Sequence, residues 1–197
     1  RQLLDKAKEI NMPQDNAIRA IKKGTGELPG VSYESITYEG YGPHGIAVIV
    51  DVLTDNKNRA VADMRHLFSK HGGNLAESGS VNWMFEKLGV IRASASGKTE
   101  DDLFEALIDF DINDISIHDD MLTITTSIAA LHDVKKSVED LDIKVEHADL
   151  EWVAKRSMDI DEEAQEKAFL FLEAIEDNDD VQNVYTDRKS TRLNSSH

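Results

Sequence analysis

The segment that decides the fold is residues 36–52, which read ITYEGYGPHGIAVIVDV. β-branched and aromatic residues flank a turn rich in Gly and Pro, a pattern typical of a β-hairpin. Apolar residues then recur at helical spacing over residues 60–68, and Gly72-Gly73 ends the helix. Residues 80–85 alternate polar with apolar side chains, which predicts a third strand. The segment therefore predicts a β-β-α-β unit.

A second α+β unit follows residue 89. Thr99 is a helix N-cap with Asp102 three positions later, and Leu103, Ala106, Leu107 and Phe110 form the apolar stripe of that helix. Ser127 caps a second helix. Alternating segments predict strands at residues 90–93, 112–117, 121–125 and 143–147. The element order β-α-β-β-α-β is that of a ferredoxin-like split βαβ domain.

The end of the chain predicts one more helix and one more strand. The helix follows Asp161, with five apolar residues on one face: Ala164, Ala168, Phe171, Leu172 and Ile175. The strand is residues 181–185. Because an isolated helix and strand cannot form a core, we expect both to return to the first unit.

The predicted fold class is therefore α+β, in four segments. These are a helical N-terminal remnant (1–26), a discontinuous β-β-α-β…α-β domain (31–88 with 156–186), an inserted acidic ferredoxin-like domain (89–155) and a tail that we expect to be non-native (187–197).

Composition limits the classes of function. The 197-residue chain is 40% hydrophobic and has no Cys, which excludes a disulfide framework and a thiolate metal site. The sequence shows no apolar run long enough to span a bilayer, so we expect a cytoplasmic protein. The net charge of −16 is uneven: residues 1–90 hold 11 acidic and 11 basic residues, whereas residues 91–186 hold 26 and 8. We therefore expect any nucleic-acid surface in the first half.

Both ends of the chain are atypical. Residue 1 is not Met and lies inside a helical pattern, so we expect a truncated N-terminus. Residues 187–197 read DRKSTRLNSSH, depart from the acidic composition before them and resemble the translation of a sequencing adapter. The alternative is a genuine polar, disordered tail. We favour the adapter and exclude these residues from the predicted fold.

Several long motifs, in order, carry a resemblance to a known family. They are residues 11–13 (NMP), 20–24 (AIKKG), 38–43 (YEGYGP), 53–56 (LTDN) with Asn58-Arg59, 70–75 (KHGGNL), 79–81 (GSV) and 179–185 (DDVQNVY). Over roughly residues 1–186 the chain resembles the YebC family. The resemblance implies a DNA-binding transcriptional regulator, or a translational activator like the mitochondrial relatives, with a link to the ribosome. It also implies the discontinuous architecture and a basic helical segment before residue 1.

Polar and basic side chains give a candidate nucleic-acid surface, because Asn, Arg and Lys are donors to phosphate and to base edges. The candidates are Arg19, Lys22 and Lys23 at the end of the N-terminal helices, and Asn56, Asn58, Arg59, Arg65, Lys70 and His71 on or beside the central helix. The alternatives are a helix-dipole role for the first three and an ordinary solvated helix face for the rest. Trp83 or Tyr41 would stack a base if exposed, although a Trp in an alternating strand is more often core. The Gly-rich motifs are alternatively explained by tight turns and close packing.

Three motifs resemble enzyme or metal sites, but each lacks the sequence context that its chemistry requires. Residues 40–45 match G-x-G-x-x-G, but a strand follows in place of a helix and Pro43 removes an amide, which favours a hairpin turn. His66 and His71 are five residues apart, outside the spacing of a zinc helix. The acidic cluster of residues 177–180 lacks the ligand pattern of an EF-hand. We therefore predict no catalytic residue, no metal and no cofactor.

Two hypotheses of different class remain. In the first, the protein is a nucleic-acid-binding regulator of gene expression, or alternatively a ribosome-associated translational activator that binds ribosomal RNA or a ribosomal protein. In the second, the acidic inserted domain docks on a basic protein partner. Neither hypothesis involves a membrane or a small-molecule substrate.

Overall fold

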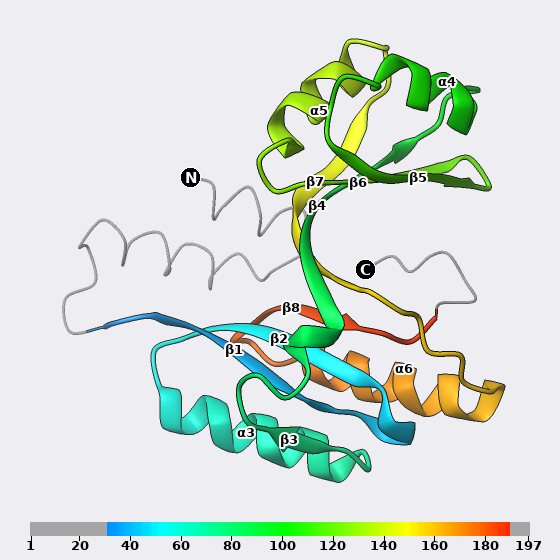
Figure 1. Ribbon diagram of the computed structural model, residues 1–197. Coiled ribbons are helices and arrows are strands. Elements are labelled where there is room, and N and C mark those ends of the chain that lie inside the picture. The colour runs from blue at the N-terminus through cyan, green and yellow to red at the C-terminus, as the bar shows by residue number, and fades with distance from the viewer. Residues whose placement is uncertain (1–30, 190–197) are drawn as a thin grey trace. The chain divides into compact units, whose positions relative to one another are not determined.

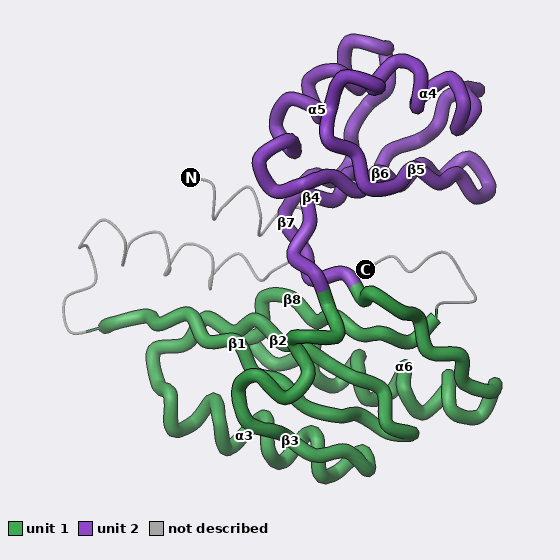
Figure 2. Tube along the Cα trace, viewed as in Figure 1, with its two compact units in different colours: residues 1–85, 154–197 green, residues 86–153 purple. Residues whose placement is uncertain are grey.

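The computed structural model describes residues 31–189, which form an α+β protein with two four-stranded antiparallel sheets and four α-helices, as the sequence predicts. The chain divides into two compact units (Figure 2): unit 1 comprises residues 1–85 and 154–197, and unit 2 comprises residues 86–153. No helix within residues 31–189 is both long and apolar enough to cross a membrane.

The described part of unit 1 is a sheet with two helices, α3 and α6, on one face (Figure 1). Its strands are β1 (Glu34–Tyr41), β2 (Ala47–Thr54), β3 (Asn74–Ala76) and β8 (Val181–Thr186), in the order β3-β1-β2-β8. The helices are α3 (Lys57–Lys70) and α6 (Glu162–Glu176). The hairpin turn between β1 and β2 contains a short 3₁₀ segment, η1 (Pro43–Gly45).

The core of unit 1 lies between the sheet and these helices. Val48, Val50 and Val52 of β2 meet the apolar faces of α3 and α6. The rings of Phe68 and Phe171 pack edge to face, with centroids 5.0 Å apart. All five apolar positions predicted for the buried face of α6 are buried, because their 3–4 spacing places them on one side of the helix.

The strand predicted at residues 80–85 is wrong. The strand that pairs with β1 is β3, and the chain then turns through a 3₁₀ segment, η2 (Asn82–Met84), before β4 begins at Phe85. The physical reason is a buried carboxylate. Glu39 of β1 accepts hydrogen bonds from the backbone N–H groups of Gly79, Val81 and Asn82, so these groups do not join a ladder.

Unit 2 is a second sheet, in the order β5-β6-β4-β7. Its elements are β4 (Phe85–Ser94), α4 (Glu100–Ala106), β5 (Ile112–His118), β6 (Met121–Thr126), α5 (Leu131–Glu139) and β7 (Val145–Ala154). The β5–β6 hairpin turns through Asp119 and Asp120 at φ 50° and 67°, a left-handed conformation that Asp tolerates. The core of unit 2 includes Ile91, Leu103 and Ile124.

The predicted helix ends of unit 2 are confirmed at one helix and shifted at the other. Thr99 and Asp102 form the reciprocal hydrogen bonds of a capping box at α4. Ala106, predicted to be buried, is exposed, whereas Leu103 and Leu107 of the predicted stripe are buried. Ser127 caps a turn that precedes α5: its Oγ accepts from Ala130 N at 3.2 Å, and the helix begins at Leu131.

The fold of unit 1 extends beyond the predicted end of the native chain. Asp187 is buried and accepts a hydrogen bond from Ala47 N at 2.9 Å. Met158 N donates to Asp187 O, and Lys189 N donates to Met158 O at 2.8 Å. Asp187 and Lys189, at the start of the segment that we expect to be non-native, therefore pair with Ala47 and Met158 of unit 1.

Candidate nucleic-acid interface

The structure describes part of the predicted surface. Arg19, Lys22 and Lys23 lie outside the described residues. The other six predicted residues lie on or beside α3, in unit 1.

Asn56 and Arg59 stabilise the fold of unit 1. Asn56 is the N-cap of α3, and its side chain accepts from Arg59 N at 3.0 Å. The Arg59 guanidinium donates to Asp180 Oδ2 at 2.7 Å, to Asp55 Oδ1 at 3.0 Å and to Thr54 Oγ1 at 3.2 Å. The hydrogen bond to Asp180 raises the pKa of Arg59. Two carboxylates thus hold this cation, which ties the start of α3 to the residues before β8.

His71 also has a structural role. It is the C-cap of α3, where its backbone N–H donates to Phe68 O at 3.3 Å. Its half-buried ring lies 5.8 Å from the ring of Phe171. The side chain therefore packs against α6.

Four predicted residues on α3 are exposed: Arg59, which carboxylates hold, and Asn58, Arg65 and Lys70. Within residues 31–189, neither Arg65 nor Lys70 has an ion-pair partner. Lys57, at the start of the helix, pairs with Glu34 at 3.6 Å. Of the predicted residues that the structure describes, Arg65 and Lys70 are thus the cations left for an external anion.

The structure adds Trp83, whose sequence pattern favoured a core position. The residue is 64% exposed, and its indole Nε1 donates to Ser80 O at 2.9 Å. The loop that carries it is fixed by Glu39, which is 3% exposed. Glu39 Oε2 accepts from Gly79 N at 2.9 Å, and Oε1 accepts from Val81 N at 3.0 Å and Asn82 N at 2.9 Å. An exposed aromatic ring is therefore presented by a loop with a buried, charged anchor.

Two exposed cations, Lys155 and Arg156, lie where the chain bonds to the Trp83 loop. Lys155 N donates to the carbonyl oxygen of Met84, the residue that follows Trp83, at 2.9 Å. Lys155 and Arg156 are exposed and have no ion-pair partner within the described part of the chain. The sequence analysis did not identify them, because it summed the charge over each half of the chain and these two cations lie in the acidic half. Both residues belong to unit 1, whereas residues 86–153, with 17 acidic and 6 basic residues, carry a net charge of −11.

The exposed cations of α3 and the Trp83 loop lie on opposite faces of the unit 1 sheet. Tyr38 of β1 packs against the core beneath α3 and α6. Side chains alternate along a strand, so Glu39 points to the other face, where it binds residues 79–82. The structure therefore does not combine the predicted helix residues and Trp83 into one site.

The Gly-rich motifs permit close packing. A Cβ on Gly73 would lie 2.1 Å from Tyr41 O, and a Cβ on Gly40 would lie 2.5 Å from Asn74 O. The G-x-G-x-x-G stretch is the turn of the β1–β2 hairpin, with no helix N-terminus after it. These contacts agree with the packing explanation of the motifs.

Unit 2 contains a charged cluster of its own. Glu151 accepts two hydrogen bonds from Arg92, at 2.8 and 3.1 Å, and its Oε2 lies 2.7 Å from His147 Nε2. Burial raises the pKa of Glu151, but the hydrogen bonds from His147 and Arg92 outweigh it and bring the pKa to about 2. The carboxylate is satisfied by its neighbours, and the cluster joins Arg92 of β4 to β7.

Comparisons with known proteins agree with this structure. Residues 33–188 match the family model described as TACO1/YebC second and third domain. A probable transcriptional regulatory protein of a Nitratiruptor species is 48% identical over 189 residues, or 96% of this chain and 79% of the relative. One from Chlorobaculum tepidum is 46% identical over 187 residues, or 94% and 74%. The crystal structure of a conserved hypothetical protein of Aquifex aeolicus superposes with a TM-score of 0.79 at 40% identity, covering 96% of this chain and 79% of that one. The chain therefore belongs to the TACO1/YebC family, whose bacterial relatives are named probable transcriptional regulatory proteins.

Proposed function

We propose that this protein is a nucleic-acid-binding regulator of gene expression and not an enzyme, with duplex DNA as the first candidate ligand. The observation that carries the proposal is that Arg65 and Lys70 stay exposed and unpaired within residues 31–189, although the chain has 38 acidic and 22 basic residues. Where carboxylates are in such excess, a cation without one is free to bind phosphate. The relatives named probable transcriptional regulatory proteins support the same reading. Asn58 adds a donor for phosphate or a base edge.

The test is a titration of random and genomic duplex DNA across a range of salt concentrations. Each phosphate contact contributes about −0.9 to the slope of log K against log salt. Arg65→Gln with Lys70→Gln is expected to reduce the slope by about 1.8. The matched control is Lys136→Gln with Lys144→Gln, which removes the same charge from exposed positions in unit 2. Equal slopes for both double variants would refute a role for α3. The same titration with Lys22→Glu and Lys23→Glu tests the N-terminal candidates.

A ribosome-associated translational activator is the alternative, and exposed Trp83 favours it because ribosomal RNA offers unpaired bases. The acidic unit 2 suits a basic ribosomal protein or another basic partner. Co-sedimentation with ribosomes, together with weak binding to duplex DNA, would select this alternative. Tight duplex binding without sedimentation would reject it.

We also propose the finer domain description. The β-α-β-β-α-β element order and the strand order β5-β6-β4-β7 support a ferredoxin-like domain, expected at residues 89–155 and corresponding to unit 2 (residues 86–153), inserted into a domain expected at residues 31–88 and 156–186. Limited proteolysis tests it, since cleavage near residues 86 and 154 should release a stable inner fragment. We further propose a cytoplasmic location, which fractionation of cells tests. We also propose that the protein has no cofactor, which mass spectrometry of the purified protein tests.

A further inference from the structure

We infer that Trp83, Lys155 and Arg156 form a binding site for single-stranded nucleic acid, in which an unpaired base stacks on the indole and the two cations bind flanking phosphates. The inference rests on the proposed function and deepens it, because it names the form of nucleic acid and places its contact on the sheet face opposite α3.

Trp83 is prepared for stacking. Its only polar atom, Nε1, already donates to Ser80 O at 2.9 Å, so the exposed ring offers its π-face without an unmet hydrogen bond. The three hydrogen bonds to Glu39 hold the preceding loop before any ligand arrives. A pre-ordered anchor loses little conformational entropy on binding.

Lys155 and Arg156 supply charge at the same place. The backbone hydrogen bond from Lys155 N to Met84 O brings the backbone of these two residues next to the loop that carries Trp83. No carboxylate among residues 31–189 pairs with either of them. The planar guanidinium of Arg156 suits two-pronged phosphate binding, and the Lys155 ammonium acts as a point charge.

The combination favours an unpaired strand over a duplex or a protein. In a duplex the bases are stacked on one another, whereas a loop or single strand can offer a base to an aromatic ring. Exposed Trp residues also anchor protein interfaces, but there they fill apolar, desolvated pockets. Ser80 and Asn82, in the same loop as Trp83, are polar, and Lys155, whose backbone bonds to Met84 of that loop, and the adjacent Arg156 are charged. Aromatic rings combined with cations are typical of single-strand binding sites.

Trp83 provides its own optical readout. The chain contains two Trp residues, so Trp152→Phe leaves Trp83 as the single indole. In that background we would titrate oligo(U) RNA, oligo(dT) DNA and a dA·dT duplex, each of about 12 nucleotides, and follow quenching of the indole fluorescence. Stronger quenching and tighter binding by the single strands are expected. The RNA and DNA arms show whether the 2′-hydroxyl contributes.

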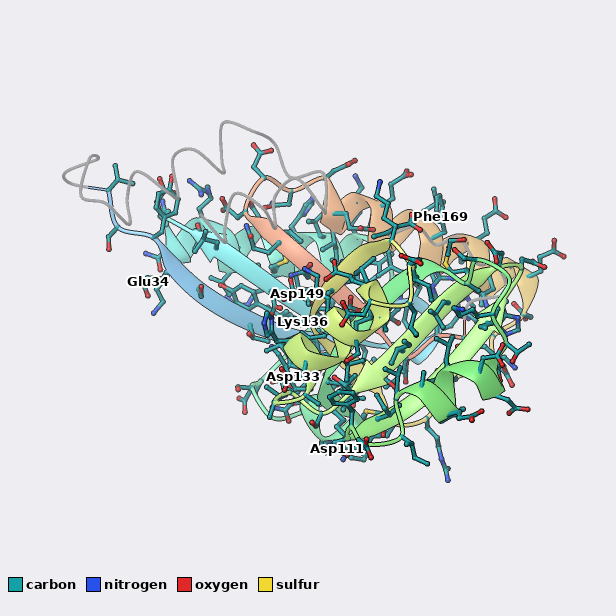
Figure 3. The ribbon with its side chains drawn as sticks, turned by 90° about the horizontal axis from the view of Figure 1, so that it is seen from above. Glu34, Asp111, Asp133, Lys136, Asp149 and Phe169 are labelled. Carbon is teal, nitrogen blue, oxygen red and sulfur yellow. The ribbon has the colours of Figure 1, made fainter. Side chains whose placement is uncertain are left out.

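Substitutions then separate stacking from charge. Trp83→Ala is expected to weaken single-strand binding by roughly 10-fold to 100-fold, measured by anisotropy of labelled oligonucleotides, and Trp83→Phe should restore most of the affinity. Phe169→Ala, which truncates an exposed aromatic side chain on α6 (Figure 3), is the matched control and should change nothing. Lys155→Gln with Arg156→Gln should reduce the salt slope by about 1.4, since each single-strand phosphate contributes about −0.7. Lys136→Gln with Lys144→Gln should leave the slope unchanged.

The outcomes distinguish the inference from the proposed function. If Trp83→Ala binds single strands as tightly as the parent, or if the duplex quenches Trp83 as strongly as they do, the inference fails. Duplex binding that depends on Arg65 and Lys70 would survive that failure. If Trp83→Ala loses a protein ligand but keeps oligonucleotide affinity, the site is a protein contact and the inference is overturned. Rescue by Trp83→Phe excludes a folding defect as the cause of a loss.

Discussion

The substitution Glu39→Gln tests whether the buried carboxylate of Glu39 fixes the loop that carries Trp83. The carboxylate of Glu39 is buried and accepts three backbone hydrogen bonds, at 2.9, 3.0 and 2.9 Å, from Gly79, Val81 and Asn82. The amide has the same shape but only one oxygen. That oxygen keeps the donors of Val81 and Asn82, and the new NH₂ group then faces the N–H of Gly79.

The magnitude follows from the bonds that change. A hydrogen bond to a charged group contributes about 1.5–3 kcal/mol, and a neutral one about 1 kcal/mol. Glu39→Gln loses the bond to Gly79 and weakens the other two, and relief from burying a charge offsets part of this loss. We expect the free energy of unfolding of unit 1 to fall by about 2–3 kcal/mol. Glu39→Ala leaves all three donors without the carboxylate and should cost about 4–5 kcal/mol.

The assay is urea unfolding in the Trp152→Phe background, where Trp83 fluorescence reports on unit 1 alone. The matched control is Glu77→Gln, which neutralises an exposed carboxylate in the same segment and should change stability by less than about 0.5 kcal/mol. Acrylamide should quench Trp83 more readily in Glu39→Ala before the global transition begins. If Glu39→Gln unfolds at the same urea concentration as Glu77→Gln, the carboxylate does not anchor the loop and the reasoning is refuted.

Three further predictions concern the packing and the charged networks. Gly73→Ala should destabilise unit 1 by at least about 2 kcal/mol in thermal unfolding, because its Cβ would lie 2.1 Å from Tyr41 O; an unchanged melting temperature would contradict this. Asp180→Asn should cost roughly 1–3 kcal/mol by weakening the bond from Arg59, and double-mutant cycles with Arg59→Gln should show coupling between the two positions. The folded-state pKa of Glu151, about 2, lies below its ordinary 4.5, so its contribution is present above pH 4.5 and is lost as pH falls from 4.5 to 2. Unit 2 should therefore lose up to about 3 kcal/mol over that window, and the loss should be absent in Glu151→Gln.

Local patterns predicted the elements whose conformation depends on nearby residues. The buried face of α6 was predicted because Ala164, Ala168 and Phe171 recur at helical spacing. The capping box of Thr99 and Asp102 was predicted because both partners lie within one turn. In each case the deciding contacts lie within the segment that shows the pattern.

The Trp83 loop was not predictable in this way. Residues 80–85 alternate as a strand does, but their conformation depends on Glu39, about forty residues earlier in the chain. No local pattern shows that the backbone N–H groups of this segment will donate to a distant carboxylate instead of to a neighbouring strand. The error about the strand and the expectation that Trp83 is core therefore have one cause, a long-range hydrogen-bonded contact.

The candidate cations show a similar limit. Arg59 resembles a phosphate ligand in the sequence. In the structure, however, the pairing of β8 with β2 brings Asp180 close, and Asp180 forms an ion pair with Arg59. Lys155 and Arg156 are separated from Trp83 in sequence by the whole of unit 2, and Lys155 bonds to the Trp83 loop, at Met84, only because the chain returns to unit 1. The detectable signal was two adjacent cations in an acidic half of the chain, which the average charge of that half concealed.

The charge of unit 2 predicts how the affinity for nucleic acid should depend on salt. At 0.15 M salt, charges more than about 8 Å from a bound phosphate are screened, so the local cations dominate and affinity falls as salt rises. At 0.01 M the screening length is about 30 Å, roughly the size of a small domain, and the net charge of −11 on residues 86–153 then repels the ligand. Affinity should therefore pass through a maximum as salt is lowered. Neutralising exposed acids of unit 2, with Asp109→Asn, Asp140→Asn and Asp142→Asn, should move the maximum to lower salt. We would plot the logarithm of the binding constant against the logarithm of the salt concentration for the parent and for the triple variant. Two identical straight lines over the whole range would show that the acidic unit has no influence on binding.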